Sequence, residues 1–354
     1  MKKSPINEFV GGYTKPHTIF AYKRSLKLFF EAINKDPVGY FSAKNDYDVD
    51  MKTYINYIQS RAPITKKHDI STVRTFLDEN GVNIKEELSK KTQKLIKLYT
   101  KKIKAITQDI VCTPKELKKI LQYGTLKDRA LFLFLSSTGL RIDEALKLTF
   151  DDIRFDKNPV LVDVSAPITK TSESRITFMS NEAKDCLLEW KKHRPEYLHQ
   201  ACTKSIKKKW KEDPHIFPFA YPTAHRMWNR LLEQSGFAER DKTTGRHRRH
   251  IHTLRKYFRI YLAPKATSDV TELLLGHQDA LGNVYRDKYP ESKLGEMYKR
   301  AVPDISVFEV APDLSEVNEK LDKKDKTIED MQMQINDLQG KYGDLLHELF
   351  LQKK

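Results

Sequence analysis

One segment of this chain carries the alternating pattern of β-strands, whereas the segments around it carry the three- and four-residue spacing of helices. In "VLVDVSAPITKTSESRITFMS", two β-branched stretches, 160–164 and 175–179, flank a polar connection. This pattern predicts a β-hairpin. Because it stands among many predicted helices, we expect a mainly α protein with a small β-hairpin or sheet, an α+β fold.

The region before the hairpin starts with a run of amphipathic helices. In "HTIFAYKRSLKLFFEAIN" the apolar positions recur at three- and four-residue steps, which predicts a helix with one buried face. Similar patterns follow around "MKTYINYIQSRA" and "ISTVRTFLDENG", and one last, lysine-rich helix is predicted in "KEELSKKTQKLIKLYTKKIKAI". Residues 1–110 are expected to form a small helical domain whose basic faces are either solvated or bind DNA.

A second domain is predicted to begin near residue 111. In "VCTPKELKKIL", Thr113 suits an N-cap, Pro114 suits the first helical position, and Glu116 would complete a capping box. These three residues are the usual signature of a helix start, so we expect the first helix of the second domain to begin here.

The next segment, "DRALFLFLSSTGLRIDEALKLTFDDI", predicts a buried helix, because residues 130–135 are apolar on every side. We expect residues 136–139 to break this helix and a second helix to run from about 141 to 148. Helices are predicted again after the hairpin, in "NEAKDCLLEWKKH" and "RMWNRLLEQSGF".

The last part of the chain, 311–354, has a different pattern. Apolar residues step by three and four over nearly five heptads, which predicts a coiled coil. The seam consists of Leu314, Val317, Leu321, Ile328, Met331, Ile335, Leu338, Tyr342, Leu345 and Leu349. Two glycines, Gly340 and Gly343, weaken it by about 1 kcal/mol each relative to alanine. We expect an oligomerisation or partner helix; the alternative is a helix packed on its own domain.

The net charge of +16 and the pI of about 9.4 favour a polyanionic partner: DNA, RNA or an anionic membrane surface. The tail from residue 313 holds 10 acidic and 7 basic residues, so the positive charge is concentrated in the preceding part. No apolar run reaches the roughly 18 residues needed to span a bilayer, and the N-terminus has no apolar signal region. With three scattered cysteines, we expect a cytoplasmic protein.

Four separated segments hold side chains suited to phosphate chemistry. They are "TGLRIDEALKL" with Arg141, "ITKTSESRITF" with Lys170, "HTLR" with His252 and Arg255, and "LLGHQDALGNVYRDKYPE" with His277, Tyr285 and Tyr289. Each segment also has an ordinary structural explanation. Glu144 offers Arg141 an ion-pair partner, a lysine in a hairpin turn is usually just exposed, and a tyrosine is more often packed in a core.

The order and spacing of these segments resemble the tyrosine recombinase (phage integrase) family. The resemblance covers residues 111–310, and "LRIDEALKLTFDDI" and "HIHTLRKYF" are its strongest parts. The N-terminal helices are more loosely similar to the core-binding domain of the family. The run "YRDKYPESKLGEMYKRAVPDISVFE" before a coiled coil resembles archaeal integrases. The resemblance implies a core-binding domain (1–110), a catalytic domain (111–310) and a coiled-coil tail (311–354).

The resemblance also implies roles for the site residues. Arg141 and Arg255 would clamp the scissile phosphate, because a guanidinium can bind two oxygens at once. Lys170 would protonate the leaving 5′-oxygen, His252 would transfer a proton, and His277 would donate a hydrogen bond to a phosphate oxygen. A tyrosine nucleophile keeps the energy of the phosphate in a covalent bond, so no metal or cofactor is expected.

The nucleophile departs from the family pattern. Many members place the tyrosine nine residues after the histidine of Leu-Gly-His, and here that position is Arg286. Tyr285 lies one residue earlier and is our prediction, because a loop tolerates a one-residue deletion. Tyr289, which precedes a proline, is the alternative. Tyr298 is expected in the core.

Three arginines near His252 are predicted to contact the flanking DNA backbone or merely water: Arg246, Arg248 and Arg249.

The sequence therefore predicts a DNA strand-exchange enzyme, an integrase of an archaeal virus or mobile element, in a prokaryotic cell or virus-infected host. The resemblance implies a homotetramer on double-stranded DNA and no membrane partner. Three alternatives stay open: a chromosome-dimer resolvase, a type IB topoisomerase, and a DNA-binding module without catalysis.

Overall fold

The computed structural model describes most of the chain. The described residues are 4–101, 108–169, 172–204, 212–242, 244–277, 289–308, 327–328 and 330–335. The chain divides into two units, which we describe separately. One consists of Met1–Gln108 with Arg240–Arg246, and the other of Asp109–Glu239 with His247–Lys354.

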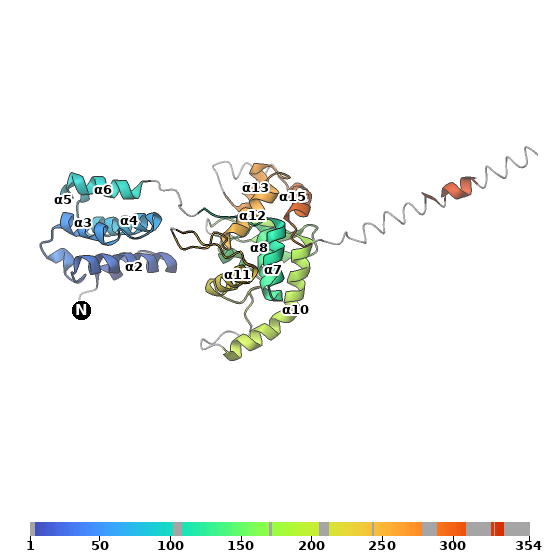
Figure 1. Ribbon diagram of the computed structural model, residues 1–354, viewed down its shortest axis with the longest axis horizontal. Helices are drawn as coiled ribbons and strands as arrows, with labels where there is room; N and C mark the ends of the chain where they lie inside the picture. The colour runs from blue at the N-terminus through green and yellow to red at the C-terminus, as the bar shows by residue number, and fades with distance from the viewer. Residues whose placement is uncertain are drawn as a thin grey trace, which may run out of the picture. The chain divides into compact units, whose positions relative to one another are not determined.

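The first unit is helical. Its elements are α1 (Pro5–Gly11), α2 (Pro16–Ile33), the 3-10 turn η1 (Tyr40–Ser42), α3 (Tyr47–Tyr57), α4 (Pro63–Glu79), α5 (Ile84–Glu87) and α6 (Lys90–Thr100). Helix α4 packs between α2 and α6 (Figure 1). Several helices start where proline at the first position already has helical φ, as in α1, α2 and α4.

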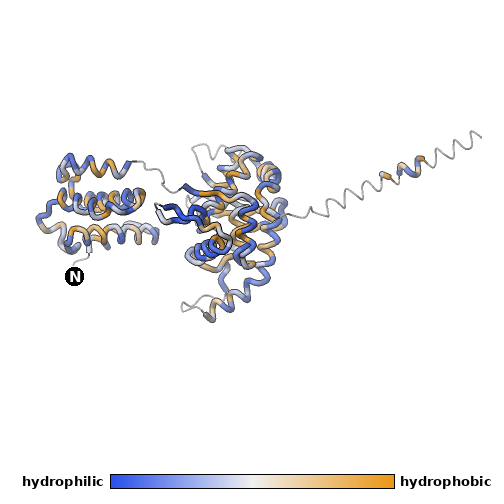
Figure 2. The backbone as a smooth tube through the Cα atoms, in the orientation of Figure 1, coloured by the Kyte–Doolittle hydropathy of each residue, from blue (hydrophilic) through white to orange (hydrophobic). Residues whose placement is uncertain are grey.

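The apolar face of α2 is buried, as its periodicity predicted. Leu26 and Phe29 are fully buried, and the rings of Phe29 and Tyr54 meet edge to face at 5.4 Å. Figure 2 shows hydrophobic and hydrophilic residues alternating along these helices. A polar contact also crosses this core, because Ser25 donates a hydrogen bond of 2.7 Å to the buried carboxylate of Asp69.

The single lysine-rich helix predicted at the end of this unit is divided in two. Leu88 is extended and buried, and Ser89 caps α6 by accepting a hydrogen bond from the Thr92 backbone. The side chain and backbone N–H of Ser89 also donate to Asp48 at 2.9 Å. This contact between distant residues determines where the helix is interrupted, and no periodicity in the sequence indicates that position.

The second unit combines helices with a small sheet. Its elements are α7 (Pro114–Gln122), α8 (Leu126–Thr138), α9 (Ile142–Ala145), the 3-10 turn η2 (Phe150–Asp152), β1 (Ile153–Arg154), β2 (Val160–Val164), β3 (Arg175–Met179), α10 (Asn181–Lys204), α11 (Tyr221–Ser235), α12 (His252–Leu262), α13 (Ser268–Leu275) and α15 (Glu291–Ile305). The capping box predicted at Thr113, Pro114 and Glu116 is present.

The predicted hairpin is confirmed as β2 and β3, which pair antiparallel with Val162 opposite Thr177. A short strand that was not predicted, β1, extends the sheet on the other side of β2. The mainly α fold with a small sheet is therefore confirmed for the described residues.

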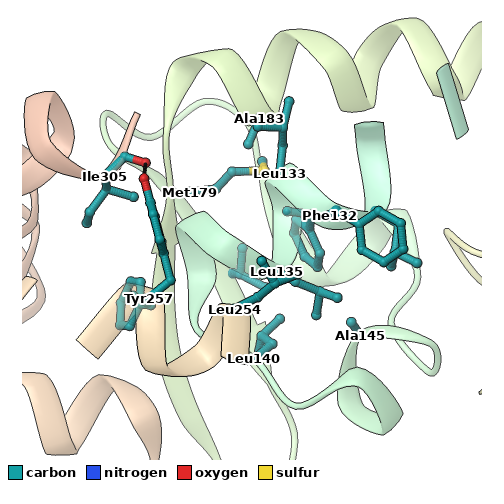
Figure 3. Close-up of a cluster of buried hydrophobic side chains, with 14 of the residues drawn as sticks. Phe132, Leu133, Leu135, Leu140, Ala145, Met179, Ala183, Leu254, Tyr257 and Ile305 are labelled. Atoms are coloured by element: carbon teal, nitrogen blue, oxygen red, sulfur yellow. Dashed lines mark hydrogen bonds between the residues drawn. The ribbon is translucent and has the colours of Figure 1, made fainter. Parts of the chain in front are cut away.

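Helix α8 is the centre of this unit. Residues 130–135 are all buried, as predicted. Helix α8 packs against β3 and also against α10 and α12, which lie beside it in Figure 1. Figure 3 shows Leu135 and Leu140 close to Leu254 of α12, and the hydroxyl of Tyr257 donating to the carbonyl of Ile305 at 2.9 Å. The predicted break at residues 136–139 is confirmed at the last of these residues, because the helix continues to Thr138 and ends at Gly139.

Most of the predicted coiled coil, 311–354, lies outside the described residues. The described part, 327–328 and 330–335, is helical, and its seam residues Ile328, Met331 and Ile335 are exposed. No helix in the described part of the chain is long and apolar enough to span a bilayer.

Candidate active site

The turn that presents Arg141 depends on glycine. Gly139 ends α8 with φ +65°, a left-handed conformation that favours glycine. A Cβ atom built there would lie 2.4 Å from the buried ring of Phe258. Arg141 follows as the N-cap of α9, a helix of four residues and not the longer one predicted to reach Leu148.

The last carbonyls of α8 are satisfied by side chains from three other elements. Tyr298 of α15 donates to the Ser137 carbonyl at 2.9 Å, and Thr177 of β3 donates to the Thr138 carbonyl at 2.8 Å. Arg255 of α12 donates to the Gly139 carbonyl at 2.6 Å. These bonds replace the partners that a helix end lacks and hold the turn before Arg141 in place. Tyr298 is a core residue, as predicted.

The carboxylate of Glu144 holds two arginines. It lies 2.9 Å from Arg141 Nη1 and 2.6 Å from Arg175 Nη2, and it is almost fully buried. Burial opposes its ionisation, but the hydrogen bonds and charges of Arg175 and Arg141 outweigh it and lower the pKa of Glu144. The predicted pair of Glu144 with Arg141 is confirmed, and Arg175 is a partner that the sequence did not indicate.

Arg255 is buried, with 4% of its surface exposed, and it joins three segments. Besides the Gly139 carbonyl, it donates to the Leu275 carbonyl, and its Nη2 lies 3.1 Å from His277 Nε2. Burial and the charge of Arg141 lower the pKa of Arg255 to about 9, so the guanidinium remains charged at pH 7. Its contact with the Gly139 carbonyl places Arg255 against the turn that presents Arg141 two residues later.

His252 is the first residue of α12, one turn before Arg255. Partial desolvation, followed by the charges of Arg255, His250, Lys256 and Arg141, lowers the pKa of His252 from its ordinary value of 6.5. The ring is therefore mainly neutral at pH 7 and can accept a proton.

His277 reaches the site through a second glycine turn. Gly276 ends α13 with φ +69°, and a Cβ atom there would lie 2.6 Å from the Arg175 side chain. The turn brings the His277 ring between Arg255 and the carboxylate of Glu272, whose Oε2 lies 2.5 Å from Nδ1. The structure thus brings four predicted site residues together: Arg141, His252, Arg255 and His277.

Two other predicted site residues, Lys170 and Tyr285, lie outside the described residues. The alternative nucleophile, Tyr289, is 9% exposed, and Lys293 Nζ lies 5.1 Å from the centre of its ring.

The three arginines predicted beside the site differ in their surroundings. Arg249 is buried and forms ion pairs with Glu116 at 3.0 Å and with Glu239 at 3.5 Å. It supports the packing of this unit, so we do not retain it as a DNA contact. Arg248 is half-buried, 3.8 Å from the same Glu239. Arg246 is exposed and belongs to the segment grouped with the first unit.

Arg175 and Glu272 are the site residues that the sequence analysis missed. Arg175 is the first residue of β3, and Glu272 lies five residues before His277. Neither position has a local signal: Glu144 becomes a neighbour of Arg175 only after folding, and Glu272 meets the His277 ring only because the chain turns at Gly276. Among the described residues, no group of three or more His, Cys, Asp or Glu side chains is placed to hold a metal ion.

Comparison with known proteins gives one matching family. Residues 111–291, more than half of the chain, match the model of the phage integrase family. The tyrosine recombinase XerA of Saccharolobus solfataricus (strain ATCC 35092 / DSM 1617 / JCM 11322 / P2) is 26% identical over 278 residues, 74% of this chain and 79% of that protein.

Two solved structures show the same fold. The Tn1549 transposon integrase in complex with transposon right end DNA has a TM-score of 0.56 at 16% identity, covering 84% of this chain and 98% of that chain. A λ integrase tetramer bound to a Holliday junction has a TM-score of 0.55 at 16% identity, covering 78% of this chain and 75% of that chain.

Proposed function

The chain belongs to the phage integrase family of tyrosine recombinases, and from this premise we propose that it is a site-specific DNA recombinase that cuts and rejoins strands through a covalent 3′-phosphotyrosyl intermediate. Its substrate would be double-stranded attachment-site DNA, and its task the integration or excision of a mobile element or virus. It would act in the cytoplasm of a prokaryotic cell or virus-infected host.

One observation carries this proposal. Arg141, His252, Arg255 and His277 come from segments up to 136 residues apart in sequence and meet at one place in the second unit. Arg255 contacts both the Gly139 carbonyl, in the turn before Arg141, and the His277 ring, and His252 lies one turn before it on α12, so guanidinium and imidazole groups converge there. A cluster of this kind is stabilised by an anion, and a phosphodiester fits the donors available.

The chemistry follows from these groups. The tyrosine oxygen attacks phosphorus, the bond to the 5′-oxygen breaks, and the phosphate stays on the enzyme. Arg141 and Arg255 neutralise the charge that develops on the non-bridging oxygens, and His277 donates a hydrogen bond to one of them. In our proposal the neutral His252 accepts the proton of the tyrosine, and Lys170 protonates the leaving 5′-oxygen.

Tyr285 is our proposed nucleophile and Tyr289 the alternative. Tyr285 lies one residue before the usual position, which a one-residue deletion in a loop explains, whereas Tyr289 precedes a proline that biases it towards an extended conformation.

The assembly and the domains are part of the same proposal. We propose a core-binding domain at 1–110, a catalytic domain at 111–310 and a coiled-coil tail at 311–354, with Arg246 and Arg248 near the DNA backbone. Recombination requires four strand cleavages, so the active form would be a homotetramer on DNA; the λ integrase tetramer on a Holliday junction supports this by likeness of fold.

A covalent trap tests the proposed function. The full chain is incubated, with EDTA present, with DNA from its own genetic context, stopped with detergent, and any DNA-linked peptide is identified by mass spectrometry. We expect linkage through Tyr285, with no adduct from Tyr285→Phe although that variant still binds DNA. Linkage through Tyr289 would move the nucleophile, and binding without any adduct would contradict the enzymatic function. Relaxation of supercoils without joining of two duplexes would indicate a topoisomerase.

A further inference from the structure

A chain of charged contacts runs behind His277. Arg259 Nη2 lies 2.6 Å from one carboxylate oxygen of Glu272, and the other oxygen lies 2.5 Å from His277 Nδ1. On its far side, His277 Nε2 lies 3.1 Å from Arg255 Nη2. The imidazole is thus held between an acceptor and a donor.

The fold builds this arrangement from two helices. Arg255 and Arg259 lie one turn apart on α12, and Glu272 lies on α13, which packs against it. Gly276 then reverses the chain in the left-handed conformation, and the backbone N–H of His277 donates to the carbonyl of Glu272 at 3.0 Å. The same residue, Glu272, therefore holds both the backbone and the ring of His277.

The two ring contacts assign the proton of His277. An ionised carboxylate only accepts hydrogen bonds, and a guanidinium only donates them. The hydrogen must therefore sit on Nδ1, facing Glu272, while the lone pair of Nε2 faces Arg255. Because the contact at one nitrogen determines the state of the other, Glu272 controls which face of the ring is presented to the site.

We propose that Glu272 is a positioning residue of the recombinase reaction, which acts through His277 by holding its Nδ1–H and by balancing the charge of the imidazolium. In the imidazolium form, Nε2 carries a second proton, taken from solvent. It then donates a hydrogen bond to a phosphate oxygen. This inference rests on the proposed function, since it needs a phosphate at the site. It adds a residue that the motif segments do not contain.

A purely structural role for Glu272 is the competing explanation. Its ion pair with Arg259 could simply join α13 to α12, whatever His277 does. The Arg259 side chain is 57% exposed, whereas that of Glu272 is only 25% exposed. The His277 side chain is 46% exposed, so both ion pairs of Glu272 are partly exposed and each contributes little to stability. Variants that remove one contact at a time therefore decide between the two explanations.

The first measurement uses the free protein and needs no DNA cleavage. Histidines are labelled with ¹⁵N, and the His277 signal is identified by its loss in His277→Ala. We expect hydrogen on Nδ1 in the native chain, a shift towards the Nε2–H form in Glu272→Ala, and retention of the Nδ1–H form in Glu272→Gln, whose amide oxygen still accepts. An unchanged His277 signal in Glu272→Ala would overturn the proposal.

The second measurement is a double-mutant cycle on the rate of covalent adduct formation at saturating DNA. We expect Glu272→Ala to lose about tenfold or more, but less than the roughly 10²–10³-fold expected for the loss of one phosphate donor. Glu272→Gln should lose less than Glu272→Ala. In a His277→Ala background, removing Glu272 should change the rate little, because its partner is already gone.

Two variants separate the explanations. Arg259→Ala removes the ion pair and keeps the histidine contact, so its rate should stay near the native one. Glu189→Gln is the matched control, because Glu189 pairs with a histidine, His193, on the distant helix α10. Equal losses from Glu272→Ala in both histidine backgrounds, or a full loss in Arg259→Ala, would overturn the proposal. Absence of any adduct from the native chain would instead contradict the proposed function. The ¹⁵N signals would still test whether Glu272 holds the Nδ1–H of His277.

Discussion

Glu144 and Arg175, 31 residues apart in sequence, form an ion pair with a nitrogen–oxygen distance of 2.6 Å that is closed from solvent at both ends. Arg175 also donates to the Leu274 carbonyl, and Glu144 holds Arg141. This one pair therefore ties the first residue of β3 to the turn that presents Arg141 and to the end of α13 that presents His277. The site depends on residues that would not themselves touch a phosphate.

Replacing Glu144 should destabilise the protein strongly. Glu144→Gln removes the charge opposite Arg175, whose side chain is 6% exposed, and breaking a buried pair in this way costs about 3–5 kcal/mol. Urea unfolding should show a lower midpoint with an unchanged slope. The exposed Glu189→Gln is the control and should leave the midpoint unchanged. An equal midpoint for Glu144→Gln would show that the pair contributes nothing to stability.

The same pair predicts a loss of stability in acid. Because the folded-state pKa of Glu144 is lowered, its contribution is fully present above the ordinary value of 4.5 and is lost as the pH falls through the folded-state pKa. The difference in unfolding free energy between the native chain and Glu144→Gln should therefore shrink below pH 4.5. A difference that is constant with pH would contradict the ionic origin of the effect.

Two glycine substitutions separate backbone strain from crowding. Gly139 and Gly236 both have left-handed φ, but only at Gly139 would a Cβ atom meet a side chain, the ring of Phe258 at 2.4 Å. Gly236→Ala should cost about 1–2 kcal/mol from strain. Gly139→Ala should cost about 1–3 kcal/mol more, because a packed ring must move. Thermal unfolding of both variants gives the difference, and equal losses would rule out the crowding.

Arg255→Lys should be a severe change, although it keeps the charge. A single ammonium cannot replace the planar contacts with the Gly139 carbonyl, the Leu275 carbonyl and His277. We expect adduct formation to fall by roughly 10²–10³-fold, and the unfolding free energy to fall by about 1–3 kcal/mol as a carbonyl loses its donor. Arg154→Lys is the control, because Arg154 pairs with Asp163 and has no proposed role in the site. A comparable loss in that variant would show that any replacement of arginine by lysine slows the reaction.

The rate of adduct formation should depend on the ionisation of His252. Since desolvation and neighbouring cations lower its pKa, the free protein should hold a neutral ring above pH 6.5 and a charged one only below it. At subsaturating DNA, which reports the free enzyme, the rate should be level above pH 6.5 and fall in more acid solution. His252→Gln should slow the reaction and remove this fall. An acid limb that persists in the variant would assign it to another group.

The tail prediction concerns assembly. If the apolar seam around Ile328, Met331 and Ile335 joins chains, truncation after residue 311 should lower the oligomer mass and leave phosphate chemistry intact. Light scattering, with and without DNA, measures the mass, and the covalent trap measures the chemistry. An unchanged mass would favour a tail that packs within its own chain.

Much of the local structure followed from the sequence alone. The hairpin, the capping box at Thr113 and the buried helix at 130–135 depend on spacing and side-chain type within a few residues, and these predictions are confirmed. The family resemblance was also carried by short segments, and the family match bears it out. Errors arose where a distant contact decides an element's end, as at Ser89, whose partner is Asp48.

The assembly of the site was decided by tertiary structure. The partners of Arg255 lie up to 116 residues away, and Glu144 is shared with Arg175 only because β3 returns beside α8. Arg249, predicted to contact the DNA backbone or merely water, is buried and pairs with Glu116. A sequence determines which side chains can bind a phosphate. Their desolvation and their choice of partner depend on packing, which cannot be predicted from the spacing of residues along the chain.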